Sequence, residues 1–503
     1  MTENTNKKPL TPNSPAQAGS SAQHRHLAIE IIESLKPQIG HPLSKARQVY
    51  LSLYQLVESG TLPYDAQLPP SRQLATQLGV SRNTVVCVYE QLCAEGLLTA
   101  NGRRGTRVCK QLTPKHQPET VGWSVSKRAL STQAKLNQSH DLTPGEPDTA
   151  LFPNKKWQSA LSTAAKLDSN KLNYRSTALS STQEAITRYL ATYRSLVVDP
   201  DQVIVTSGTR QSLALAATVF ADPGDQAIAE CPGYLGAVEA FRQQGLRVLP
   251  GPVGSNGMTM PEAMESQPRI IYLTPCFQYP LGMPLGTEQR TSLLNLSRDS
   301  GVVLFEDDYD SEFRDDSQPR AALAAESNGA RVLYAGTFSK ILFPAVRVGW
   351  LVVPKSCIHV AQSTLRALGG GNTTIMQTAV TELLNNGSIA HHLSRARQVY
   401  GQRRLVLIDS LADNPWFKSQ SSVTGSLTLN LELIHNVNRN ALEKAMKEAL
   451  IGAHPLEKYY WHSEPSDTCK ALVIGLGNVQ TLGVPNAIER LSAALDQARE
   501  QTK

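Results

Sequence analysis

The chain has 503 residues, of which 41% are hydrophobic and 18% are charged, a composition typical of globular proteins with more than one domain. Its longest apolar stretches, such as residues 213–221, are far shorter than the roughly 18 residues of a membrane-spanning helix. The formal net charge of +6 is modest, but residues 41–110 carry eight Lys and Arg against four acidic residues. We therefore expect no membrane partner and a concentration of positive charge near one end of the chain.

The N-terminal segment and the cysteines indicate the cellular compartment of the protein. The first 25 residues lack the apolar core of a secretion signal, and residues 1–40 are predicted to be a disordered leader. The seven cysteines show neither a C-x-x-C pair nor the spacing of metal ligands. We expect a cytoplasmic protein with reduced thiols and no metal site.

Residues 41–110 are predicted to form a winged helix-turn-helix domain. Ser71 is expected to cap a first helix and Gly79 to close it, while Ser81 caps a second helix that ends at Gly96. The buried seam between the two helices is predicted from apolar residues at helical spacing, which are Leu74, Leu78, Val85, Tyr89 and Leu92.

The outer face of this domain is predicted to bind a double-stranded DNA operator. Side chains at helix N-termini reach phosphates and base edges, and Asn101-Gly102 suits a two-residue type I′ turn followed by a basic β-wing. The predicted DNA-binding residues from this pattern are Arg72, Ser81, Arg82, Asn83, Thr84, Arg103, Arg104 and Thr106. The alternative is a helical module whose basic face contacts only solvent or another protein.

A polar linker is predicted at residues 111–140, and the pattern changes after it. Short β-rich runs alternate with helical stretches, which predicts βαβ units around a mostly parallel sheet in an α/β large domain at residues 141–355. A smaller α+β domain is predicted at residues 356–503. The expected strands are residues 203–206, 226–230, 246–249, 269–274, 302–306, 331–335 and 348–353.

Two motifs of the large domain follow predicted strands, at the edge where α/β sheets bind ligands. Ser207, Gly208 and Thr209 lie at the start of a helix, where amides and hydroxyls suit a phosphate. Asp307 and Tyr309 follow a hydrophobic strand, and a carboxylate there would keep a pyridine nitrogen protonated.

Two further motifs complete a predicted cofactor site. Lys340 lies between Thr337 and Ser339 on one side and Arg347, seven residues on, on the other. A lysine amine forms Schiff bases, and a guanidinium binds phosphate with two hydrogen bonds. Tyr234 offers a ring for stacking. Taken singly, Lys340 also suits a surface lysine, Asp307 a helix cap and Tyr234 core packing; together the motifs favour one site.

These segments resemble two known families. The stretch from residue 43 to 108 resembles the GntR winged-helix family, in which residues placed like Arg72, Arg82, Thr84 and Gly105 contact DNA. From Asp141 onward, EDDYDSEFR and GTFSK-x6-R resemble the fold type I aminotransferase-like domain of MocR regulators. That resemblance implies a homodimer and the cofactor pyridoxal 5′-phosphate (PLP).

The resemblance also implies the role of each site residue. Lys340 would hold PLP as an internal aldimine, Asp307 would pair with the pyridine nitrogen, and Tyr309 would bond the ring oxygen. The phosphate would be bound by a set of hydroxyl and guanidinium groups, joined by a tyrosine that reaches the partner's phosphate: Ser207, Thr209, Thr337, Ser339, Arg347 and Tyr174.

Three stretches depart from the family pattern. Val473 stands where relatives carry an arginine that binds a substrate carboxylate, and Cys276 and Phe277 stand where many carry Ser and His. Residues 175–181 lack the usual Gly-Asp-Pro-x-Gly turn. The sequence therefore supports a bound cofactor better than it supports turnover of amino acids.

Our leading hypothesis is a transcription regulator in which PLP, or its adduct with a small amino compound, shifts the DNA-binding domains. The alternative is a working PLP-dependent aminotransferase with an accessory N-terminal domain. A third hypothesis is a PLP sensor that controls vitamin B6 supply and needs no amino substrate.

Overall fold

The computed structural model describes residues 34–38, 40–102, 105–109, 140–168, 170, 179–262, 264, 266–314, 321–371, 373–418, 426–462 and 466–500. The chain divides into two compact units, residues 1–124 and residues 125–503. Within these ranges, no helix has the length and apolar character needed to cross a membrane.

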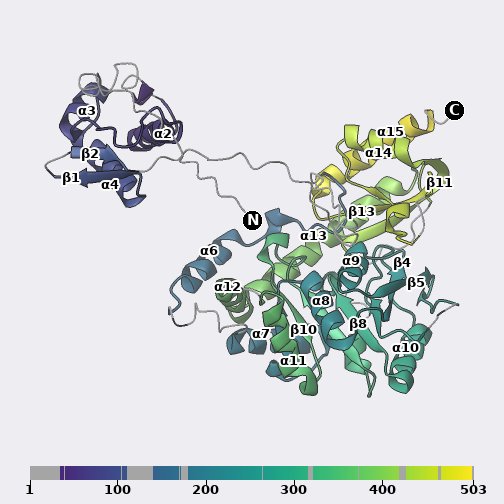
Figure 1. Cartoon of the computed structure of the whole chain (residues 1–503). Coiled ribbons are helices and arrows are strands. Elements are labelled where there is room, and N and C mark those ends of the chain that lie inside the picture. The colour runs from purple at the N-terminus through teal and green to yellow at the C-terminus, as the bar shows by residue number, and fades with distance from the viewer. Residues whose placement is uncertain are drawn as a thin grey trace, which may run out of the picture. The chain divides into compact units, whose positions relative to one another are not determined.

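The first unit is a winged helix (Figure 1). Its elements are α2 (Lys45–Glu58), α3 (Ser71–Leu78), α4 (Arg82–Ala94), β1 (Leu98–Asn101) and β2 (Gly105–Val108). The five residues predicted to form the seam between the helices are all buried in its core. Leu35, inside the range predicted as the leader, is buried in the same core.

The helix ends of this unit confirm all but one of the predicted caps. Gly79 closes α3 in the left-handed conformation with φ 64°, and the Ser81 side chain accepts the amide of Thr84 at 3.1 Å at the start of α4. Gly96 follows α4 with φ 72°. The prediction for Ser71 was wrong, because Pro70 is the N-cap and Ser71 is already the first helical residue.

The wing differs from its predicted turn. β1 and β2 pair antiparallel with Asn101 opposite Gly105, so residues 102–104 connect the strands and the two-residue turn was wrong. Gly105 has φ +77°, and a Cβ there would lie 3.0 Å from the side-chain nitrogen of Gln67. The conformation and the crowding both favour glycine at the start of β2. Arg103 and Arg104 lie outside the described residues.

The second unit is built on an eight-stranded sheet with the order β3-β10-β9-β8-β7-β4-β5-β6. The pairs among β4, β5, β7, β8 and β9 are parallel, while β10 and β6 run antiparallel to their neighbours, which confirms a mostly parallel sheet. Its strands are β3 (Val203–Thr206), β4 (Gln226–Cys231), β5 (Arg247–Gly254), β6 (Gly257–Met258), β7 (Ile270–Leu273), β8 (Val303–Asp308), β9 (Val332–Thr337) and β10 (Gly349–Val352).

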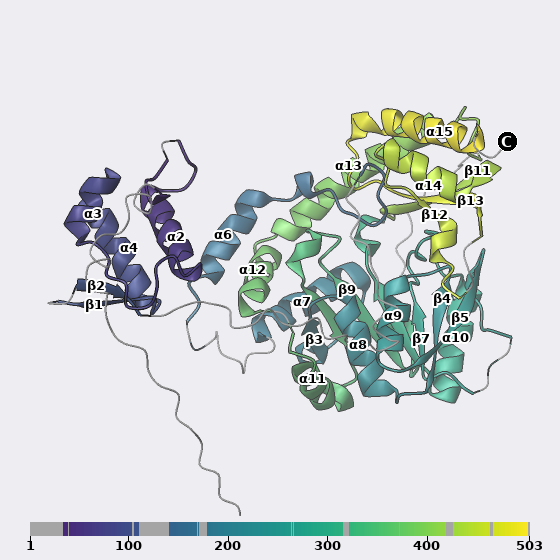
Figure 2. The same cartoon turned by 45° about the horizontal axis from the view of Figure 1, so that its top comes forward.

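Helices cover both faces of this sheet (Figures 1 and 2). Along β3, Val203 and Val205 pack into one hydrophobic cluster while Ile204 packs into another on the opposite face. This alternation is the two-residue period of a strand buried on both sides. The helices are α6 (Asn154–Ala164), α7 (Ser180–Arg194), α8 (Thr209–Phe220), α9 (Leu235–Gln243), α10 (Thr287–Ser300), α11 (Ile358–Ala367), α12 (Thr374–Asn385) and α13 (Ser388–Leu411).

The C-terminal part is a smaller antiparallel α+β layer that follows the long helix α13. Its sheet has the order β11-β13-β12, and two helices pack on it to form one hydrophobic cluster. The elements are β11 (Thr428–Asn438), α14 (Arg439–Glu448), β12 (His454–Pro455), β13 (Thr468–Gly475) and α15 (Val484–Glu500).

Candidate functional site

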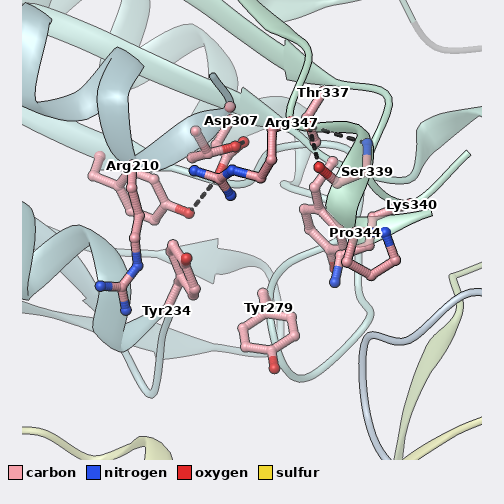
Figure 3. Close-up of a pocket in the computed structure, with 13 residues that line it drawn as sticks. Arg210, Tyr234, Tyr279, Asp307, Thr337, Ser339, Lys340, Pro344 and Arg347 are labelled. Atoms are coloured by element: carbon pink, nitrogen blue, oxygen red, sulfur yellow. Dashed lines mark hydrogen bonds between the residues drawn. The ribbon is translucent and has the colours of Figure 1, made fainter. Parts of the chain in front are cut away.

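A cavity of about 260 Å³ lies where β8 and β9 end and α8 begins (Figure 3). It gathers predicted site residues from segments that are far apart in the chain: Gly208, Thr209, Tyr234, Asp307, Tyr309, Thr337, Ser339, Lys340 and Arg347. Ser207 does not line the cavity, and Tyr174 lies outside the described residues.

One end of the cavity is a cluster of hydrogen-bond donors suited to a phosphate. The Thr337 hydroxyl donates to the Ser339 hydroxyl at 3.0 Å, and the Ser339 amide donates back to Thr337 Oγ1 at 3.1 Å. Arg347 lines the same end of the cavity, and its own backbone is in the left-handed region with φ 50°. Gly208 is the N-cap of α8, whose first amides point outward with the positive end of the helix dipole. This combination binds dianionic groups well.

Asp307 supplies the negative group of the cavity. Its carboxylate accepts hydrogen bonds from the Tyr272 hydroxyl at 2.8 Å and from the Thr209 hydroxyl at 3.3 Å. Burial raises the pKa of Asp307 to about 7, although these two hydrogen bonds oppose the shift. A cationic ring nitrogen beside this carboxylate would offset the cost of burying its charge.

Two more acids on β8 fix the register that aims Asp307 into the cavity. Glu306 accepts the backbone amides of Leu323 and Ala324 at 2.8 and 2.9 Å. Asp308 forms a buried ion pair with Arg194 and accepts the hydroxyl of a neighbouring tyrosine at 2.6 Å. Because side chains alternate along a strand, these two acids lie on the face opposite Asp307.

Lys340 lies in the wall of the cavity, where its amine donates to the backbone carbonyl of Gly145. Burial lowers the pKa of Lys340, while the carboxylates of Asp310, Glu146 and Asp307 oppose the shift. A lower pKa increases the fraction of neutral amine, which is the nucleophilic form. The position therefore suits covalent bonding to a carbonyl carbon.

Aromatic side chains form the other wall. The rings of Tyr234 and Tyr279 meet edge to face, with centroids 6.1 Å apart, and the Tyr309 hydroxyl donates to the Phe277 carbonyl at 3.1 Å. A Cβ on Gly236 would lie 2.3 Å from Tyr234 Cζ, so only glycine leaves room for this ring. The wall gives a flat ligand ring a surface to stack on.

Four residues that line the cavity were not predicted from the sequence: Arg210, Tyr272, Tyr279 and Pro344. Tyr272 lies within an apolar strand and is indistinguishable there from a core residue. Arg210 directly follows the predicted glycine-containing motif, and Tyr279 lies in a loop that departs from the family pattern, so position gave a usable signal for both.

Three positions that depart from the family pattern are apolar in the structure, whereas residues 175–178 of the third stretch lie outside the described residues. Val473 is fully buried in β13, opposite Asn430 and His454 on the neighbouring strands. Cys276 and Phe277 are buried, and burial raises the pKa of the Cys276 thiol to about 12. None of the three supplies a charge to the cavity.

The winged helix presents most of its predicted DNA-binding residues to solvent. Arg72, Arg82 and Asn83 are exposed in the first turns of α3 and α4, and neither arginine forms an ion pair within the part of the chain that the structure describes. Thr84 is half-buried and shares a 2.8 Å hydrogen bond with Ser81. On the wing, Gly105 is exposed and Thr106 is half-buried.

Comparison with known proteins covers both units. The family "Bacterial regulatory proteins, gntR family" matches residues 45–108, and the family "Aminotransferase class I and II" matches residues 139–449. The probable rhizopine catabolism regulatory protein MocR of Rhizobium meliloti is 31% identical over 467 residues, which cover 89% of this chain and 93% of that protein.

Two further matches are a transcription regulator and the structure of an aminotransferase. The HTH-type pyridoxine biosynthesis transcriptional regulator PdxR of Corynebacterium glutamicum is 32% identical over 375 residues, with 74% of this chain and 80% of that protein covered. The crystal structure of LysN, an alpha-aminoadipate aminotransferase from Thermus thermophilus, superposes with a TM-score of 0.64 at 25% identity, covering 74% of this chain and 97% of that one.

Proposed function

Because the chain belongs to the MocR family, which joins a GntR winged helix to a class I and II aminotransferase domain, we propose that it is a transcription regulator that binds PLP in the cavity around Lys340. The DNA-binding residues would be those predicted on α3, α4 and the wing. The observation that carries the cofactor assignment is the convergence of Lys340, Asp307 and Arg347 on one cavity.

The donor set of the cavity fits the chemistry of PLP. The cofactor supplies an aldehyde, a protonatable pyridine ring and a phosphate. Lys340 would bond the aldehyde carbon, and Asp307 would keep the ring nitrogen protonated. The positive charge of that nitrogen would in turn offset the cost of burying the Asp307 carboxylate. Tyr234 would stack on the ring. The phosphate would be held by Thr209, the first amides of α8, Thr337, Ser339 and Arg347.

We infer that the effector is PLP itself or its adduct with a small amino compound. The name of the PdxR relative connects that protein with pyridoxine biosynthesis. A ligand controls DNA affinity only if it binds two arrangements of the protein with different affinity. We also propose a homodimer, with domains at residues 41–110, 141–355 and 356–503 and a linker at residues 111–140. The leader proposed at residues 1–40 is shorter than predicted, because Leu35 packs into the core of the first domain.

The cofactor assignment is tested by adding PLP to the purified protein and recording the visible absorbance of the bound cofactor. Wild type should develop this band, Lys340→Ala should lose it, and Lys444→Ala, an exposed lysine on α14, should keep it. An unchanged band in Lys340→Ala would overturn the assignment.

The regulatory part is tested by genome-wide footprinting of the purified protein with and without PLP. The genes beside the protected sites identify the regulated process, and a change in occupancy with PLP identifies the effector. Equal occupancy in both samples would contradict PLP as the sole effector.

A second candidate function is amino-group transfer. It is favoured by the match to the aminotransferase family and by the lowered pKa of Lys340. Repeated turnover with an amino donor and a keto-acid acceptor would establish it, whereas binding without turnover would leave regulation as the function of the cavity.

A further inference from the structure

A segment of the C-terminal layer, residues 459–462, contacts the turn that follows β4, and we call this segment the strap. It lies between β12 and β13 in the chain. The Gly233 amide donates to the Tyr459 carbonyl at 3.1 Å, and the Trp461 indole N–H donates to the Glu230 carbonyl at 2.9 Å. The strap therefore holds the main chain of this turn, residues 230–234, at two points.

Side-chain contacts add to these two hydrogen bonds. Cys231 Sγ lies 3.5 Å from His462 Nδ1, and the Arg242 guanidinium lies over the Trp461 ring, 5.4 Å from its centroid. Trp461 also packs against the hydrophobic cluster to which α8 and α9 contribute. The strap thus contacts both the turn and α9, the helix that follows it.

The turn held by the strap carries Tyr234, which lines the cavity around Lys340 (Figure 3). Tyr234 directly follows Gly233 and is the N-cap of α9. A Cβ on Gly233 would lie 2.0 Å from the Glu230 carbonyl oxygen, the same atom that accepts the Trp461 indole N–H. Because the turn is this tight, a displacement of that carbonyl would also move the backbone of Tyr234.

The strap reaches a second residue of the aromatic wall through Tyr459. The rings of Tyr459 and Tyr279 meet edge to face with centroids 5.5 Å apart, and their hydroxyls are 3.5 Å apart. The Tyr459 hydroxyl also lies 3.0 Å from His454 Nδ1, on β12. One segment of the C-terminal layer therefore contacts Tyr279 directly and Tyr234 through its turn.

We propose that Trp461 and Tyr459 are positioning residues for the cofactor, because the strap sets the orientation of the Tyr234 and Tyr279 rings. Neither residue lines the cavity, so each acts through the aromatic wall. The inference rests on the proposed function, since the wall is where the ring of PLP would stack. By linkage, a bound ring stabilises the strap as much as the strap stabilises the bound ring. The strap thus couples PLP binding to the C-terminal layer.

A matched pair of variants tests the role of Trp461. Trp461→Phe removes the indole N–H and keeps an aromatic ring. In the control, Trp416→Phe, the lost N–H donates to Asp496 at 3.0 Å, and the Arg499 guanidinium lies 5.8 Å from the ring centroid. Trp416 is buried in the same layer, whereas Trp461 is half-buried. General damage to the fold should therefore be at least as large in the control.

Two measurements on the full-length variants separate positioning from stability. The dissociation constant for PLP measures affinity, and the induced circular dichroism of the bound cofactor in its visible band reports the orientation of its ring. Trp461→Phe should weaken PLP binding about fivefold, as loss of one hydrogen bond predicts, and should change the dichroism per bound cofactor. Trp416→Phe should match wild type in both.

Hydrogen exchange of the wild-type protein gives a test that does not depend on the folding of a variant. Adding PLP should slow exchange in peptides that cover the strap, although the strap does not line the cavity. Failure of wild type to bind PLP would reject the proposed function. If PLP binds, equal affinity and dichroism in the two variants, or unchanged exchange in the strap, would overturn this inference alone.

Discussion

The winged helix and the cavity around Lys340 are assembled in opposite ways. In the winged helix, the polar residues that face solvent lie close together in the sequence, and local caps such as Ser81 orient them. In the cavity, Lys340 contacts Gly145 across 195 positions of the chain. A local change in the winged helix is expected to stay local, whereas a small change beside the cavity should affect both folding and ligand binding.

The largest effect is expected from a single methyl group beside the cavity. A Cβ on Gly349 would lie 2.8 Å from Gly208 Cα and 2.8 Å from the Gly336 carbonyl, both of them backbone atoms. Gly349→Ala should lower the free energy of unfolding by about 1–3 kcal/mol, the usual cost of overpacking a core. It should also weaken PLP binding, because the Gly208 backbone must move.

Urea denaturation and a PLP titration measure the two effects of Gly349→Ala. The matched control is Gly254→Ala, at a strand glycine with open space where the methyl group would be placed. Equal stability and equal cofactor affinity in both variants would show that the backbone beside the cavity accommodates an added methyl group as well as the open position at Gly254 does.

The corresponding change on the winged helix removes a charge without disturbing a core. Arg82→Ala should weaken binding to duplex DNA about tenfold and reduce the slope of log affinity against log salt by about 1, because one phosphate contact is lost. Fluorescence anisotropy over a salt series measures both. Arg366→Ala, which lowers the net charge equally on α11, should leave the slope unchanged. An unaltered slope in Arg82→Ala would remove this residue from the DNA surface.

A pH effect should distinguish the cavity from the winged helix in the ligand-free protein. Burial raises the pKa of Asp307 from 3.8 to about 7, so the folded state holds a proton that the unfolded state releases. The stability from this group is complete below about pH 4 and is lost as pH rises through about 7. Between about pH 5 and pH 8, Asp307→Asn should therefore lose less stability than wild type. The difference is about 1.4 kcal/mol for each pH unit between the lower pH and the raised pKa of about 7.

Urea denaturation at the two pH values, followed by tryptophan fluorescence, measures that difference. Other buried acids with raised pKa values, such as Glu306 and Asp310, remain in both proteins, so the comparison isolates one carboxyl group. The same loss of stability in variant and wild type would mean that Asp307 is already ionised at the lower pH.

The smallest effect is expected from a glycine in the winged helix. Gly79 closes α3 with φ +64°, and a Cβ there would meet no atom within 4 Å. Gly79→Ala should cost only about 1 kcal/mol, the penalty of a left-handed conformation without crowding. Protection of the α3 amides from hydrogen exchange in the full chain measures this loss. Unchanged protection would contradict the strain argument.

The strands and the chemically distinctive residues were predictable, because short-range patterns determine both. All seven predicted strands are present. Lys340 and Asp307 line one cavity as their positions after strands suggested, and Arg347, predicted from its place seven residues after Lys340, lines it too. Gly145 and Tyr272 were not predictable. Gly145 reaches Lys340 only through the fold, and Tyr272 has the sequence context of an ordinary buried strand residue.

The errors also have local causes. Ser71 was expected to be an N-cap because serine is favoured there, but Pro70 is the residue before the first helical turn, which moves the serine into the helix. The wing was predicted with a two-residue turn because Asn-Gly is a strong hairpin signal, while the actual pairing leaves three residues between the strands and places a left-handed glycine at position 105.

The three consecutive acids of β8 make this strand sensitive to insertions and deletions. A slip of one residue would still present a carboxylate to the cavity, from either Glu306 or Asp308 in place of Asp307. The slip that brings Asp308 into the cavity would put Tyr309 in its place and leave Arg194 buried without its partner, at a cost of about 3–5 kcal/mol. The slip that brings Glu306 into the cavity would put Phe305 in its place and leave the Leu323 and Ala324 amides without their acceptor. Arg194 and the backbone amides of Leu323 and Ala324, none of which lines the cavity, therefore determine together which of three similar carboxylates faces the ligand.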